Sequence, residues 1–287
     1  MKVSGFTFLR DAVRNGYPFE ESIRSLLPIV DEFVVAIGSS QDDTRARVAK
    51  INDPKIRIID TNWNERMTDR GFVYGQQKMI AQYNCSGDWA FYLEGDEVLH
   101  ESELSAIRAS MLTHLNNSAV EALYFDFYHF YGSPDTLGVG GYRQAPRIIR
   151  NSIRSYAPDG LFFLVLDENK RGRYPRACSA NAHIYHYGHA RKAEFTRAKL
   201  QQVGKYWGRS ETKFNGYGNI DPKEVRSFKG THPEIMREWI TANAEPRLAF
   251  NPEYRLSKRD IRNRIRFWLE DQFGLEISKK HFKALDV

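Results

Sequence analysis

The stretch FYLEGDEVLH, from Phe91 to His100, carries an aromatic and aliphatic run into three carboxylates within four positions. The apolar residues before Glu94 are typical of a buried strand, and Gly95 allows another group to approach the backbone closely. In an extended segment alternate side chains share a face, so we expect Glu94 and Asp96 to point one way and Glu97 the other. The stretch is either a solvated acidic turn or a two-carboxylate site.

A two-carboxylate site needs a partner for its charge. Two carboxylates about 4 Å apart repel by roughly 4 kcal/mol at an effective dielectric near 20, and a divalent cation or a shared proton removes that cost. In open α/β sheets, ligands bind outside the carboxyl ends of the strands, where Glu94 and Asp96 lie. A hard ion such as Mg²⁺ or Mn²⁺, shared with a diphosphate, suits oxygen ligands.

The rest of the first half alternates short apolar strands with amphipathic segments, a pattern typical of a mainly parallel sheet with helices on its faces. We expect strands at 2–9, 32–37, 56–60, 89–93, 122–131 and 147–150. Helices are expected from Pro18, after the turn GSSQDDT, over 75–83, and after a cap at Ser102. Strand signals fade near residue 190, so we expect an α/β domain over 1–190 and a helical region over 191–287.

Composition bounds the class of protein. With 287 residues and 41% hydrophobic residues, the chain can form one large α/β domain with an appendage. It has no apolar run of about 18 residues and no signal-like N-terminus, so we expect a soluble, cytoplasmic protein. The net charge of +6 suits a polyanion: nucleotide phosphates, nucleic acid or an anionic membrane. Cys85 and Cys178 lack the spacing of metal or redox sites and are expected to be buried or idle thiols.

The order of several motifs is more specific than any one of them. A first strand is followed by YPFEESIRSLLPIVDEFVV, by GSSQDDT and then by GDWAFYLEGDEVLHE. Over roughly residues 3–190 this order resembles glycosyltransferase family 2, whose members are inverting sugar transferases of the GT-A fold. The resemblance implies a metal-dependent enzyme of glycan biosynthesis that moves a sugar from a nucleotide diphosphate to an acceptor hydroxyl.

The same resemblance assigns roles to individual residues. Glu94-Gly95-Asp96 would occupy the family's DXD element, with Asp96 on the metal and Glu94 nearer the ribose or the ion. The residues implied to line the nucleotide-sugar pocket are Thr7, Phe8, Arg10, Ser39, Asp42 and Lys78. Two departures leave the donor nucleotide open: Glu94 replaces the first aspartate, and Ala36 and Ile37 stand where paired aspartates are usual.

Two further roles have competing candidates. Asp159, in Pro158-Asp159-Gly160, is our candidate for the general base, although a turn aspartate is its ordinary role. Its rivals are Asp126, Asp167 and Glu168. His186, in the family-like YHYG, is our candidate for a metal ligand, and a hydrogen-bonded core histidine is the alternative. Strand alternation would turn His186 away from both His183 and His189.

Near the C-terminus, Ile261, Ile265, Trp268 and Leu269 share one face of a helix among arginines. We expect this face to pack against the catalytic domain; peripheral contact with an anionic membrane and a dimer interface are the alternatives. The expected partners are a nucleotide-sugar donor and a glycan, lipid-linked or small-molecule acceptor, with no nucleic acid. Two other functions remain open: a nucleic-acid-binding protein, from the charge and the aromatic residues, and a non-catalytic nucleotide-binding relative of the GT-A fold.

Overall fold

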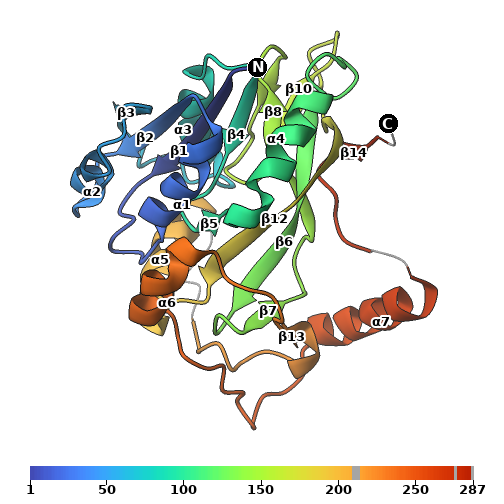
Figure 1. Ribbon diagram of the computed structural model, residues 1–287. Coiled ribbons are helices and arrows are strands. Elements are labelled where there is room, and N and C mark those ends of the chain that lie inside the picture. The colour runs from blue at the N-terminus through green and yellow to red at the C-terminus, as the bar shows by residue number, and fades with distance from the viewer. Residues whose placement is uncertain (209–213, 275–276, 286–287) are drawn as a thin grey trace.

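The computed structural model describes residues 1–208, 214–274 and 277–285. A twisted mixed β-sheet runs through the molecule and carries helices on both faces (Figure 1). The predicted fold class is confirmed: the protein is α/β, with parallel strands in the central sheet and helices in the C-terminal part of the chain.

The first half of the chain forms the parallel part of the sheet. Its elements are β1 (Val3–Leu9), α1 (Phe19–Leu26), β2 (Glu32–Gly38), α2 (Thr44–Lys50), β3 (Ile56–Thr61), α3 (Phe72–Tyr83) and β4 (Trp89–Tyr92). The strands lie in the order β3, β2, β1, β4, and each neighbouring pair is parallel. Their carboxyl ends therefore meet at one edge, where the acidic stretch follows β4.

The second half extends the main sheet with strands of both directions and adds a separate three-stranded antiparallel sheet. Its elements are β5 (Glu97–Val98), α4 (Leu104–Thr113), β6 (Ala122–Tyr131), β7 (Thr136–Gly138), β8 (Gln144–Arg150), β9 (Ser155–Tyr156), β10 (Leu164–Leu166), β11 (Gly172–Arg173) and β12 (Arg176–His189). Strand β8 lies antiparallel between β4 and β6, and the long strand β12 runs parallel to β6. The short strand β5 pairs with β12, with His186 opposite Glu97, which joins the histidine run to the acidic stretch.

Two apolar layers hold the sheet. Phe19 and Ile23 of α1 pack with Ile107 and Met111 of α4 against one face. On the other face, Ala81 of α3 packs with Phe6, Val34 and Ala36. The fully buried strands β2 and β4 explain why the sequence is apolar without alternation there, because both of their faces are covered.

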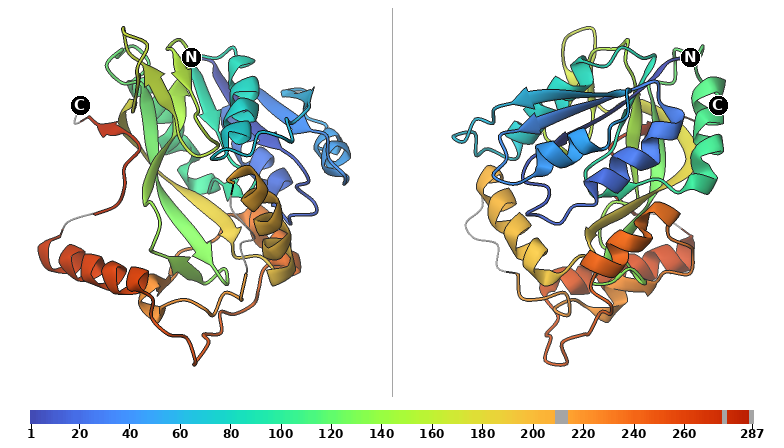
Figure 2. Two further views of the ribbon diagram at one scale, coloured as in Figure 1. Left: turned by 180° about the vertical axis from the view of Figure 1, so that it is seen from behind. Right: turned by 60° about the vertical axis from the view of Figure 1, so that its left-hand side comes forward.

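Beyond β12 the chain forms α5 (Ala193–Tyr206), β13 (Val225–Ser227), α6 (Arg237–Asn243), α7 (Lys258–Phe273) and β14 (Lys283–Ala284). Figure 2 shows α5, α6 and α7 in the lower part of the molecule, with α7 apart from α5 and α6 in the left view. No helix in the described part of the chain is long and apolar enough to cross a membrane. The division into domains at residue 190 stays a prediction, but α5 packs directly over the site described below.

Some local predictions need correction. Ser102 does not cap α4: it lies in a short 3₁₀ turn, Glu101–Glu103, and the imidazole of His100 accepts the Ser102 N–H there. Helix α3 begins three residues earlier than predicted, at Phe72, after Gly71 in the left-handed conformation. Cys85 and Cys178 are both buried with free thiols.

Candidate active site

The chain leaves strand β4 in a tight turn. The N–H of Glu97 donates to the carbonyl of Glu94 at 3.0 Å, which closes the turn. A Cβ atom on Gly95 would lie 2.8 Å from Leu9 Cδ2, so the close approach expected of this glycine is present. The alternation expected of an extended segment does not apply, because the turn itself sets the directions of Glu94 and Asp96.

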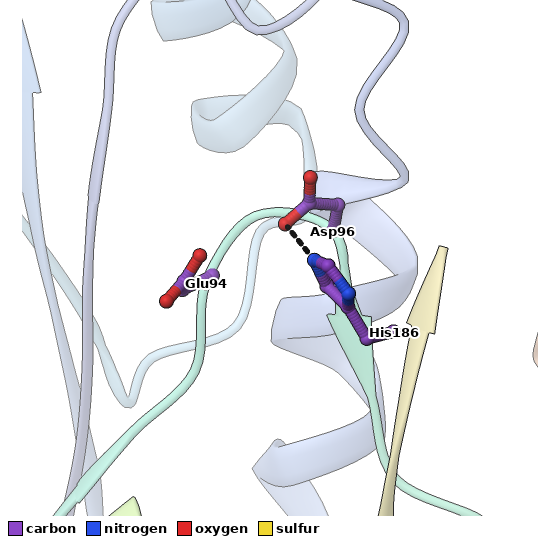
Figure 3. A group of neighbouring side chains, drawn as sticks. All are labelled: Glu94, Asp96 and His186. Carbon is purple, nitrogen blue, oxygen red and sulfur yellow. Dashed lines mark ion pairs between the residues drawn. The ribbon is translucent and has the colours of Figure 1, made fainter. Parts of the chain in front are cut away.

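Glu94, Asp96 and His186 each bring one ligand atom within 4.8 Å of the others (Figure 3). His186 Nε2 lies 3.6 Å from Asp96 Oδ1. Two carboxylates and one imidazole form a donor set that suits Mn²⁺ or a similar divalent ion. The three side chains therefore fit a single divalent cation.

Asp96 is buried among positive charges. Its Oδ2 accepts hydrogen bonds from Lys199 Nζ at 3.0 Å and from an Arg191 guanidinium nitrogen at 3.1 Å. Burial alone would raise the pKa of this carboxyl, but Lys199, His186 and Arg191 hold the pKa well below its usual range. Asp96 is thus ionised, with Oδ2 occupied by these cations and Oδ1 directed at His186.

A second histidine fixes the tautomer of His186. A carbonyl can only accept, so the 2.8 Å contact between His129 Nε2 and the Tyr142 carbonyl places a proton on Nε2. Burial lowers the pKa of His129 well below its usual value, so the ring is neutral and its Nδ1 carries a lone pair. His129 Nδ1 lies 2.9 Å from His186 Nδ1, which must therefore be the donor. His186 Nε2 then faces Asp96 and is the ring nitrogen left available to a metal ion.

An ion-pair network lies beneath the turn. The fully buried Arg147 donates to both carboxylate oxygens of Glu97, at 2.7 and 2.5 Å, and to Glu94 at 3.3 Å. Burial, together with the charge on Glu97, raises the pKa of Glu94 to about 7. Lys78 is also buried, with Nζ 3.9 Å from the ring centre of Tyr92, and burial lowers its pKa to about 7.

A cavity of about 190 Å³ opens beside Asp96. One wall is aromatic and includes Phe8, Trp63 and Tyr74, with Trp63 and Tyr74 edge to face at 5.2 Å. Arg10 and Lys199 add positive charge to the lining. Trp63 Nε1 is buried and has no hydrogen-bond partner among the residues that the structure describes. An unpaired buried donor is costly, and Trp63 Nε1 lies against Gly38, where an added Cβ atom would clash with it.

A second cavity, of about 390 Å³, lies on the other side of Glu94. Its lining includes His186, Tyr131 and Tyr142 from the sheet side, and Glu224 and Arg259 from the C-terminal region. Three residues, Glu94, Leu161 and Lys199, line both cavities. The acidic turn therefore stands at the boundary between two cavities.

The predicted site residues are only partly brought together. Phe8, Arg10, Glu94 and Asp96 line the first cavity, and His186 lines the second.

The other predicted residues make local contacts instead. Asp42 accepts at 3.0 Å from the N–H of Thr44, the first residue of α2. Ser39 donates to Asn62, and Lys78 donates to the Gly160 carbonyl at 3.3 Å. Asp159 accepts from the Leu161 N–H at 2.8 Å, and Thr7 lies within β1. The functions assigned to these five residues stay predictions.

The histidine run differs from the prediction. A register irregularity between His186 and His189 breaks the alternation of β12. Both rings consequently line the second cavity, with centres 6.5 Å apart. His183 is separate and pairs with Glu103 at 2.6 Å.

Sequence reasoning missed several residues of the site. Trp63 follows β3 in a segment without a motif, and Lys199 belongs to the region assigned to an appendage. Arg191 lies two residues after His189, the last histidine of the run. Its position beside the run is the sequence signal that could have pointed to it.

Comparison with known proteins gives structural matches only. No family model and no curated protein matches the chain. S. aureus TarS is similar at 15% identity, over 71% of this chain and 39% of TarS, with a TM-score of 0.40. S. aureus TarS 1–349 in complex with UDP-GlcNAc matches at 15% identity, over 64% of this chain and 58% of that one, with a TM-score of 0.39. Glucosyl-3-phosphoglycerate synthase from Mycobacterium tuberculosis, in complex with Mn²⁺, UDP and phosphoglyceric acid, matches at 17% identity, over 45% of this chain and 43% of the synthase, with a TM-score of 0.30.

This chain spans between 39% and 58% of the length of these three matched chains. Function has to be inferred from the site itself.

Proposed function

We propose that this protein is an inverting, metal-dependent glycosyltransferase that moves a sugar from a nucleotide diphosphate to an acceptor hydroxyl. The observation that carries the proposal is the convergence of Glu94, Asp96 and His186 at the boundary between two cavities. A solvated acidic turn would have no reason to hold an ionised aspartate, an oriented imidazole and two cations in a buried cluster.

The first cavity is proposed to bind the donor. Aromatic walls can stack a nucleotide base, and Trp63 Nε1 can donate to a base or a sugar hydroxyl. Arg10 and Lys199 are placed to neutralise the diphosphate. Because the sequence lacks the usual paired aspartates of the nucleotide turn, the base is left open.

Glu94, Asp96 Oδ1 and His186 Nε2 would hold the divalent cation. When bound, a divalent cation stabilises the charge that develops on the departing diphosphate. The protein's own part is to keep Asp96 ionised through Lys199 and Arg191, and to hold His186 Nδ1 with His129 so that Nε2 faces the metal position. Both arrangements are made before a ligand arrives, so they need no reorganisation during the reaction.

The second cavity is proposed to bind the acceptor. It meets the donor cavity at Glu94, so an acceptor hydroxyl there would approach the sugar from the side opposite the diphosphate. The new bond from the acceptor oxygen to the sugar carbon forms as the bond from that carbon to the diphosphate breaks, which inverts the configuration. A carboxylate takes the hydroxyl proton; Asp159 is our proposed base, next to Gly160 and Leu161 of the donor cavity.

A thermal-stabilisation screen tests the proposal. UDP-, GDP-, CMP- and dTDP-sugars would be added with and without Mn²⁺, and a ligand at a hundredfold its dissociation constant adds roughly 2.7 kcal/mol to the free energy of unfolding. We expect one nucleotide class to stabilise the protein only with Mn²⁺, and sugar release from that donor to follow. Binding without turnover would favour a non-catalytic relative, and salt-sensitive nucleic-acid binding that Asp96→Asn leaves unchanged would favour the nucleic-acid alternative.

A further inference from the structure

Helix α7 turns its apolar face outward. Ile261, Ile265 and Trp268 are spaced at i, i+4 and i+7 and are 50%, 56% and 58% exposed. Phe273, at the end of the helix, is 64% exposed. The prediction that this face packs against the catalytic domain is therefore wrong for Ile261, Ile265 and Trp268, while Leu269, the fourth residue of the predicted face, is partly buried.

The inner face of α7 is held mainly by polar contacts. Arg264 forms two hydrogen bonds to Asp221, at 2.6 and 2.8 Å, and Arg143 pairs with Glu270 at 2.5 Å. Phe267 is the buried apolar residue of this helix. An ordinary surface helix buries its apolar stripe, whereas α7 buries Phe267 and leaves Ile261, Ile265 and Trp268 exposed. Its ion pairs fix the helix so that the apolar stripe remains on the surface.

The outward stripe is bordered by positive charge. Lys258 and Arg262 lie three residues before Ile261 and Ile265, which places them beside the stripe. Neither cation forms an ion pair within the described part of the chain. Of the acidic residues of α7, Asp260 and Glu270 are buried, whereas Asp271 is exposed, lies three residues after Trp268 and is 3.7 Å from Arg226.

We propose that the outward face of α7, defined by Ile261, Ile265, Trp268, Lys258 and Arg262, docks on an anionic lipid bilayer. Apolar side chains would enter the boundary between headgroups and acyl chains, while the cations contact lipid phosphates. A second copy of the chain fits less well, since it would bring the same unpaired cations to the contact. Nucleic acid would use the cations but leaves Ile261 and Ile265 without a role.

Vesicle co-sedimentation tests this docking surface. The full chain would be mixed with vesicles of 70% phosphatidylcholine and 30% phosphatidylglycerol, and separately with pure phosphatidylcholine vesicles. We expect binding to the anionic vesicles, weakened by salt, and little binding to the neutral ones. Each cation contributes on the order of 1 kcal/mol, so the double variant Lys258→Glu/Arg262→Glu should reduce the partition coefficient by more than about tenfold.

The apolar stripe is tested by Ile265→Glu/Trp268→Glu, which should abolish sedimentation with the anionic vesicles. The matched control is Leu112→Glu on α4, where the leucine is 52% exposed on another surface; it should bind as the wild type does. Should the glutamate pair unfold the helix, Ile265→Ser/Trp268→Ser repeats the test with smaller polar side chains.

Three outcomes would overturn the proposal. The first is equal binding to neutral and anionic vesicles, and the second is vesicle binding that the α7 variants leave unchanged. The third, seen by sedimentation velocity without lipid, is a dimer that the α7 variants dissociate. Because none of these readouts involves sugar transfer, they are independent of the proposed enzymatic activity.

Discussion

Lys199 Nζ lies 3.0 Å from Asp96 Oδ2, although the two residues are 103 positions apart in the sequence. The contact joins helix α5 to the turn after strand β4 and places a cation from the C-terminal region inside the proposed catalytic site. Together with Arg191 it keeps Asp96 ionised in a buried position, where an isolated carboxylate would be protonated.

Removing this cation should make the protein more sensitive to acid. A carboxyl whose pKa is lowered in the folded state stabilises the fold above its unfolded pKa, and this contribution is lost as the pH falls through the folded pKa. In Lys199→Met the pKa of Asp96 is less depressed, so acid unfolding, followed by circular dichroism, should begin at a higher pH. Lys192→Met, at the exposed start of α5, is the control. Identical acid transitions would show that Lys199 does not stabilise ionised Asp96.

Removing Lys78 should stabilise the protein, whereas removing Lys199 should destabilise it in acid. Burial lowers its pKa to about 7, so the folded state resists its protonation, and its cost to stability is largest below pH 7 and declines as the pH rises towards 10.5. Lys78→Met should therefore raise the melting temperature relative to wild type more at pH 6 than at pH 9. Lys50→Met, at the exposed end of α2, should show no such difference. An increase in melting temperature that is the same at pH 6 and pH 9 would contradict the lowered pKa of Lys78.

Trp63 should contribute to donor binding through its N–H. Trp63→Phe keeps an aromatic wall but removes the unpaired Nε1 donor. If the ligand accepts from this group, the dissociation constant of the nucleotide sugar should rise by about tenfold, corresponding to a hydrogen bond of roughly 1.4 kcal/mol. Trp239→Phe, in the apolar cluster near α6, is a control outside the cavity. Unchanged affinity in Trp63→Phe would place the ligand away from this wall.

The catalytic base can be assigned by comparing two carboxylates. If Asp159 takes the acceptor proton, Asp159→Asn should lower kcat by about 10²- to 10⁴-fold while donor binding is retained. Asp167→Asn, in a neighbouring turn, should leave kcat unchanged. Glu94 lines both cavities, so a loss of kcat in Glu94→Gln but not in Asp159→Asn would transfer the role to Glu94.

The sequence predicts the parallel half of the sheet well. Strands β1, β2 and β4 are buried on both sides, so their apolar runs are unambiguous, and the acidic stretch is correctly placed at the carboxyl end of β4. Periodicity cannot show pairings between distant segments. The contact of β5 with β12, which brings His186 to Asp96, depends on a two-residue strand and a register irregularity that leave no local pattern.

The apolar stripe of α7 shows a second limit of sequence reasoning. Its periodicity gives the face that Ile261, Ile265 and Trp268 share, but not whether that face is covered. Asp260, Phe267 and Glu270 are buried on the other side of the helix, and Arg264 is held by Asp221, 43 residues earlier in the sequence. Long-range polar contacts of this kind are specified by tertiary structure alone.

Binding of Mn²⁺ tests the central claim most directly. Titration of the full chain with Mn²⁺ in the presence of UDP, followed through the electron paramagnetic resonance signal of the free ion, measures the site without requiring turnover. We predict one site in the wild type, and affinity weakened by about tenfold or more in Asp96→Asn and in His186→Ala, while Asp43→Asn on the exposed start of α2 binds normally. Equal Mn²⁺ affinity in the wild type and Asp96→Asn would contradict the proposal that this aspartate holds the cation.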